Sequence, residues 1–96
     1  MNLIKIINMK TVLFYNDATS SMEKFMEVFP RHQAVEDEFV KAGKVLGIGA
    51  FAIPGDGAMA IFIDKESAED FVKQDPFASE GLYSTVTIKE WMDEMK

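Results

Sequence analysis

The chain has 96 residues, of which 48% are hydrophobic and 27% are charged, a balance typical of one globular domain. Its formal net charge of −6 argues against nucleic acid and against an anionic membrane as partners. The absence of cysteine excludes disulfides, thiolate metal sites and cysteine nucleophiles, and it fits a reducing cytoplasm. We therefore expect a single cytoplasmic domain over residues 1–96.

The N-terminal segment is apolar at first, but Lys5, Lys10 and Asp17 interrupt it. It is too short to span a bilayer and has no small-residue cleavage site, so we expect no targeting signal. Met9 opens the stretch "MKTVLFYND", which looks like a more usual start. Residues 1–8 are therefore expected to be either an N-terminal extension or a lengthened first strand.

The first half of the chain predicts a strand followed by an amphipathic helix. Residues 11–16 are rich in β-branched and aromatic side chains and lead into helix-capping residues, which predicts the strand. In residues 20–43, one stripe recurs at spacings of three and four, which predicts the helix, and Gly43 is placed to end it. The stripe consists of Phe25, Val28, His32, Val35 and Phe39.

The second half predicts a hairpin, a second helix and a last strand. Two apolar runs, residues 44–51 and 58–64, are joined by "AIPGDG", whose residues favour a turn. Residues 64–74 form a shorter amphipathic helix, and residues 82–91 alternate as a strand does. The resulting βαββαβ order predicts an α+β, ferredoxin-like fold, with a four-stranded antiparallel sheet and two helices on one face.

Asp75 stands directly before Pro76, where the second predicted helix must end. The last turn of a helix carries partial negative charge, so a carboxylate there is unfavourable unless a donor meets it. In the βαββαβ order, the start of the first helix and the end of the second lie at the same edge of the sheet. The only histidine of the chain, His32, lies on that first helix. We expect it to contact Asp75.

Residue types exclude several kinds of site. RNA-recognition domains of this topology need aromatic and basic residues on a central strand, whereas "GAMAIFID" has one phenylalanine and no base. Metal chaperones of this fold need a C-x-x-C loop, and a single histidine excludes a multi-histidine centre. Glu36, Asp37 and Glu38 leave a Mg²⁺ or Ca²⁺ site open, although such a run is more typical of a solvated helix face. We expect no metal.

Four motifs occur together between residues 29 and 91: the helix histidine, "PGDGAMAIF", the helix-ending "DPF" and the closing "IKEW". With them the chain resembles the YCII-related (YciI-like) family of dimeric α+β barrel proteins. The resemblance implies one YciI-like domain, a homodimer whose sheets pack face to face, and a pocket with a His-Asp dyad. One known activity in the family removes HCl from a chlorinated hydroxyquinol, while most members have no assigned substrate.

The resemblance also indicates which residues form the site. His32 matches the family's histidine, Asp75 its aspartate, and Gly49 the glycine ahead of the pocket-side end of a strand. A lone histidine on an apolar stripe is otherwise more typical of packing than of catalysis. Further candidates for the wall of a substrate pocket, with core packing as the alternative, are Phe51, Pro76, Phe77 and Tyr83.

Three functions fit these residues to different degrees. The first is a small-molecule lyase or isomerase, in which His32 is the general acid and base and Asp75 fixes its tautomer. The second is a non-catalytic module that binds or senses a small ligand in the same pocket. The third is a cofactor-dependent oxygenase, which one histidine and a distant Trp91 support poorly, so we expect no cofactor.

The second face of the predicted sheet is also informative. Helices cover one face only, and the predicted strands supply more apolar side chains than a solvated face should show. Pairing two such faces would bury them. The pattern therefore predicts a homodimer independently of the family resemblance.

Overall fold

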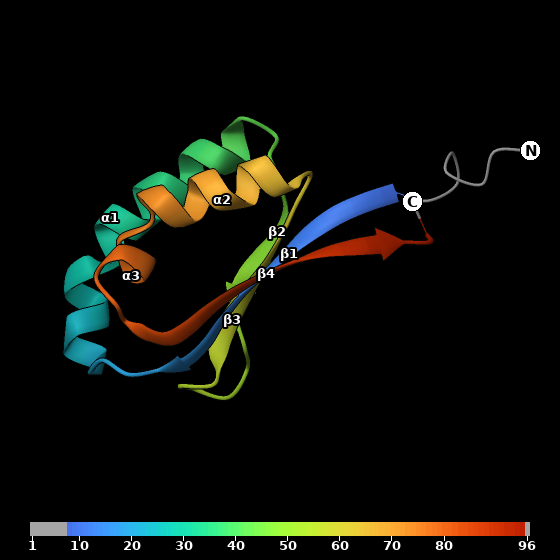
Figure 1. Cartoon of the computed structure of the whole chain (residues 1–96). Helices are drawn as coiled ribbons and strands as arrows, with labels where there is room; N and C mark the ends of the chain where they lie inside the picture. The colour runs from blue at the N-terminus through green and yellow to red at the C-terminus, as the bar shows by residue number, and fades with distance from the viewer. Residues whose placement is uncertain (1–7, 96) are drawn as a thin grey trace, which may run out of the picture.

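Four strands form one antiparallel sheet, and the helices cover one of its faces in the computed structural model, which describes residues 8–95 (Figure 1). The strand order is β2-β3-β1-β4, so the two central strands are the first and the third along the chain. The predicted ferredoxin-like α+β fold is confirmed. Its elements are β1 (Asn8–Ala18), α1 (Met22–Lys41), β2 (Val45–Ala50), β3 (Gly57–Phe62), α2 (Lys65–Gln74), α3 (Pro76–Ser79) and β4 (Tyr83–Asp93).

Capping side chains and a glycine set the boundaries of the two long helices. Ser21 caps α1 by accepting a hydrogen bond from the backbone N–H of Lys24, and Asp64 caps α2 in the same way through Ser67. After α1, Gly43 adopts a φ of 75°, the left-handed conformation that ends many helices. Both long helices contain the positions that their periodicity predicted.

The first and last strands are longer than predicted, the two hairpin strands are slightly shorter, and one helix was not predicted. β1 and β4 each run for 11 residues and pair from Asn8–Asp93 to Ala18–Tyr83, extending beyond the rest of the sheet (Figure 1). The short helix α3 follows α2 directly, because Asp75 ends one helix and caps the next. Of the segment 1–8, only Asn8 belongs to the described residues, and it begins β1; residues 1–7 lie outside them.

The hydrophobic core lies between the sheet and the helices. Leu13, Val28, Phe62, Phe71 and Leu82 are at most 2% exposed, and they come from both layers. The buried stripe of α1 faces the sheet through Val28, His32 and Phe39. Among residues 8–95, no helix combines the length and the apolar character that crossing a membrane requires.

Candidate active site

Asp75 is the centre of a buried hydrogen-bond network. It is fully buried between α2 and α3, and its carboxylate accepts hydrogen bonds from three donors. The Phe77 backbone N–H lies 3.1 Å from Oδ1, His32 Nδ1 lies 2.8 Å from the same oxygen, and the Tyr15 hydroxyl lies 2.5 Å from Oδ2. A backbone N–H can only donate, and an ionised carboxylate can accept all three bonds. The network therefore assigns a proton to Nδ1 of His32.

The predicted contact between His32 and Asp75 is thus present, although the two residues are 43 positions apart in the chain. Aromatic side chains hold the imidazole ring in place. It stacks on Phe77, with ring centroids 4.0 Å apart and an angle of 10° between the planes, and it meets Phe71 edge-on. Only 9% of His32 is exposed. Packing and the Nδ1 hydrogen bond together fix the ring, which leaves Nε2 as its second functional atom.

Tyr15 reaches Asp75 from β1 and contacts Oδ2, whereas His32 contacts Oδ1. Burial, reinforced by the neighbouring carboxylate of Asp75, raises the pKa of Tyr15 far above its ordinary value. The hydroxyl therefore keeps its proton and donates a hydrogen bond to Asp75. Burial, followed by the charge of Asp75, also raises the pKa of Tyr83, whose ring lies 5.0 Å from that of Tyr15. Both tyrosines are therefore neutral hydrogen-bonding groups.

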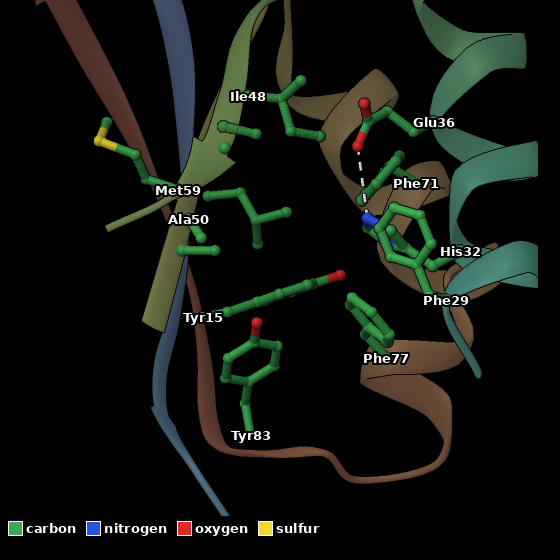
Figure 2. Close-up of a pocket in the computed structure, with 14 residues that line it drawn as sticks. Tyr15, Phe29, His32, Glu36, Ile48, Ala50, Met59, Phe71, Phe77 and Tyr83 are labelled. Carbon is green, nitrogen blue, oxygen red and sulfur yellow. Dashed lines mark ion pairs between the residues drawn. The ribbon is translucent and has the colours of Figure 1, made fainter. Parts of the chain in front are cut away.

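A cavity of about 220 Å³ lies between the sheet and α1, beside the His32 ring (Figure 2). An engineered apolar cavity of about 150 Å³ in another protein binds benzene, so this space suits one substituted ring. Its polar groups come from Tyr15, His32, Glu36 and Tyr83. Its other lining residues are Leu13, Phe29, Ile48, Gly49, Ala50, Ala58, Met59, Ala60, Phe71 and Phe77.

The predicted wall residues occupy different places. Gly49, Phe77 and Tyr83 line the cavity. Phe51 instead lines a neighbouring pocket of about 410 Å³, which shares Phe77 and Tyr83 with the cavity. Pro76 is buried at the first position of α3 and lines neither space. Pro76 therefore acts through the backbone: it begins the helix whose next residue stacks on His32.

Two polar residues of the site were not predicted. Tyr15 was counted only as part of a strand, although alternation along β1 places it on the helix-covered face beside Leu13. Glu36 was assigned with Asp37 and Glu38 to a solvated face or a cation site. Its position four residues after His32 was the available signal, because such residues are neighbours on a helix. Its Oε1 lies 3.3 Å from His32 Nε2.

The three consecutive acidic residues of α1, at positions 36–38, do not act together. Glu36 turns toward His32 in Figure 2, whereas Asp37 accepts a hydrogen bond from Gln33, and Glu38 is exposed. Within the part of the chain that the structure describes, no group of three or more histidine and acidic side chains is arranged to hold a metal ion. The chemistry that these residues offer is proton transfer.

Comparisons with solved structures agree with this fold. A 5-chloro-2-hydroxyhydroquinone dehydrochlorinase from Burkholderia phenoliruptrix AC1100, solved with 2,5-dihydroxybenzoquinone, aligns with a TM-score of 0.69 and 18% identity over 85% of this chain and 92% of that one. A conserved protein from Methanosarcina mazei Go1 aligns with a TM-score of 0.60 and 18% identity over 96% and 99% of the two chains. A dimeric protein of unknown function from Bacteroides fragilis NCTC 9343 has a TM-score of 0.51 and 14% identity over 88% and 95%.

The family comparison covers most of the sequence. A search of curated proteins finds no match to the chain. A family model described as the YCII-related domain matches residues 9–92, which cover the elements from β1 to β4 except for Asn8 and Asp93 at the two ends. The chain therefore belongs to the YCII-related family.

Proposed function

We propose that the protein is a small-molecule enzyme, a lyase or isomerase, in which His32 is the general acid and base and Asp75 holds its ring. The observation that carries this proposal is the 2.8 Å contact between Nδ1 and the buried carboxylate, at the wall of a ring-sized cavity. With Nδ1 bound to Asp75, Nε2 is the ring nitrogen that can exchange a proton with a substrate. Such a group accelerates a reaction by about 10²- to 10⁴-fold.

The composition of the cavity wall favours proton transfer over covalent catalysis. Among the described residues, its lining contains no serine, threonine or lysine, so the side chains there that could exchange a proton with a substrate are His32, Glu36 and the two tyrosines. Both tyrosines keep their protons, as their raised pKa values require. Elimination and isomerisation need only that protons be removed and delivered at defined atoms, which an imidazole can do.

The Asp75 network favours an enzyme over a module that only binds a ligand. A fully buried carboxylate is costly to desolvate, and all three of its donors come from the protein. The Asp75 network orients a single histidine, and a pocket that only binds a ligand would not require such an orientation. The similarity in fold to a dehydrochlorinase, an enzyme that eliminates HCl, supports the same class of reaction.

The proposal can be tested with 2,5-dihydroxybenzoquinone, the compound bound to that dehydrochlorinase. Its ring C–H protons exchange with solvent through a keto tautomer, in which one ring carbon gains a proton and then loses one. In D₂O, we expect the protein to accelerate the loss of the ring-proton NMR signal, and His32→Gln to remove that acceleration. Equal rates for both proteins would overturn the proposal, and saturable binding with equal rates would identify a binding module.

We also propose that the protein is a homodimer and that it acts in the cytoplasm. The face of the sheet away from the helices carries a groove of about 350 Å³, with Val12, Phe14, Met59, Ile61 and Trp91 in its wall. Gly47 and Gly49 pair with Ile61 and Met59, and a Cβ at either glycine would meet no atom within 4 Å. Apart from Lys89 and Glu90, the groove wall is apolar, and a face of this kind is suited to packing against a second copy. A dimeric protein among the solved structures of this fold supports the proposal.

A further inference from the structure

Glu36 lies beside the reactive side of His32. It is one turn further along α1, its Oε1 lies 3.3 Å from Nε2, and it lines the cavity (Figure 2). Its other oxygen accepts a hydrogen bond from Gln33 at 3.3 Å. Its side chain is 23% exposed, compared with 11% for His32. Asp75 and Glu36 therefore flank the imidazole, one carboxylate at each nitrogen.

The two carboxylates have different surroundings, which implies different roles. Asp75 is fully buried and uses both of its oxygens for protein donors, so it has no access to a molecule in the cavity. Glu36 lies at the cavity wall, where a substrate can reach it. Catalytic contacts are often long or poorly aligned before a substrate binds and tighten afterwards. A separation of 3.3 Å between Nε2 and Oε1 is short enough to become a hydrogen bond when a substrate binds.

We propose that Glu36 is a second catalytic residue, which exchanges a proton with His32 across the Nε2–Oε1 contact and takes part directly in the proton transfers of the reaction. This inference rests on the proposed function. It gives the site two acid/base groups in contact, so that Glu36 takes the role of base and His32 keeps the role of acid, where a dyad of His32 and Asp75 would supply only one such group. An elimination has use for both, because one proton must leave carbon while the leaving group gains another.

The elimination can be written with all protons accounted for. The Glu36 carboxylate takes a proton from a substrate carbon, the electrons of that C–H bond form the new double bond, and the leaving group departs with the electrons of its own bond. Nε2 of the protonated His32 gives its proton to the leaving group. Glu36 is then a carboxylic acid and His32 is neutral, and transfer of one proton from Oε1 to Nε2 restores the starting pair.

A purely structural role for Glu36 is the alternative. An ion pair at a spacing of four residues along a helix stabilises the helix only weakly, and it requires no cavity. Glu38 provides a matched control, because it lies on the same helix two residues later and is exposed. Glu36→Gln and Glu38→Gln remove the same charge from α1, and only the first removes it from the cavity.

The first measurement concerns the proton itself. His32 is the only histidine of the chain, so ¹⁵N-labelled histidine gives one pair of ring-nitrogen signals. We expect the Nε2 signal of Glu36→Gln to differ from that of the wild type at the same pH, because the carboxylate that contacts Nε2 is gone. We expect Glu38→Gln to match the wild type. Identical Nε2 signals in Glu36→Gln and the wild type would overturn the inference.

The second measurement separates this inference from the proposed function. In the deuterium-exchange assay with 2,5-dihydroxybenzoquinone, we expect Glu36→Gln to lose about 10²- to 10⁴-fold in rate, whereas Glu38→Gln keeps the wild-type rate. Loss of exchange in His32→Gln with full exchange in Glu36→Gln would overturn the role of Glu36 and leave the proposed function standing. Full exchange in His32→Gln would overturn the proposed function itself.

Discussion

At the residue scale, Asp75 explains how this sequence builds a site at a helix end. A carboxylate is unfavourable at the last turn of α2, yet here it caps α3 and binds Tyr15 and His32. Each of these partners comes from a different part of the chain. One side chain therefore ties β1, α1 and α3 together and orients the imidazole. Substitutions that keep the shape of Asp75 but remove its charge should separate its role in holding these elements together from its role in orienting the imidazole.

Replacement of Asp75 by asparagine should reduce catalysis strongly. The amide retains the size of the side chain but not the negative charge beside Nδ1, so the ring is less firmly held in its reactive tautomer. In the exchange assay, we expect Asp75→Asn to lose about 10²- to 10⁴-fold in rate. We expect the double variant with His32→Gln to be no slower than His32→Gln alone, because the two residues act as one unit.

The control for this variant is Glu69→Gln, which removes an exposed carboxylate from α2 and should leave the rate unchanged. Losses that simply multiply in the double variant would contradict a shared function of His32 and Asp75.

Tyr15 should make the stability of the protein depend on pH in the alkaline range. Its pKa is raised in the folded state, whereas a tyrosine in the unfolded chain ionises near pH 10. Its contribution is therefore complete below about pH 10 and is lost as the pH rises above that value. At neutral pH, we expect Tyr15→Phe to cost about 1 to 3 kcal/mol, since it leaves one oxygen of buried Asp75 without its donor.

Urea unfolding at neutral pH and above pH 10 would measure this change. The difference between wild type and Tyr15→Phe should shrink at the higher pH. Tyr83→Phe is the matched control, because the Tyr83 hydroxyl makes no hydrogen bond to the described residues and its removal should cost little. A constant difference across the pH range would contradict the assignment of Tyr15 as the donor to Asp75.

At the element scale, the pairing of β1 with β3 places Tyr15 at the cavity, and Gly57 permits that pairing. Gly57 has a φ of 121°, and a Cβ there would lie 2.1 Å from the backbone oxygen of Tyr15. Gly57→Ala should therefore cost about 2 kcal/mol or more and lower the Tm by roughly 8 °C or more. Gly47→Ala, whose Cβ would meet nothing within 4 Å, is the control. Equal Tm values for the two variants, measured by calorimetry, would contradict this account.

The elements also show what a single sequence can predict. The helix stripe and the Asp75-Pro76 stop predicted two helices, and topology alone then placed His32 beside Asp75. The short helix α3 was not predicted, because four residues are too few to show a periodicity and Pro76 is typical of a turn as well as of a first helical position. Glu36 was misassigned because an acidic run by itself does not show which of its members faces a cavity, and only the spacing of four residues from His32 singles out Glu36.

At the scale of the whole molecule, the sheet has one covered and one open face. The open face carries the apolar groove with Val12 and Ile61, while α1 and α2 cover the other face. We expect light scattering to give twice the chain mass of 10.8 kDa. Ile61→Asp places a charge in the groove and should yield a monomer. Val40→Asp changes an exposed apolar residue of α1 and should remain a dimer. A monomeric wild type would contradict the proposal.

The central claim is that Asp75 holds His32 in one tautomer, so that Nε2 can exchange protons with a molecule in the cavity. A two-bond ¹⁵N–¹H correlation spectrum of histidine-labelled protein tests it most directly, because His32 is the only histidine. The account predicts that Nδ1 carries a proton in the wild type whether the ring is neutral or charged, and that Asp75→Asn increases the share of the Nε2–H tautomer. A neutral wild-type ring protonated at Nε2 instead of Nδ1 would contradict the account.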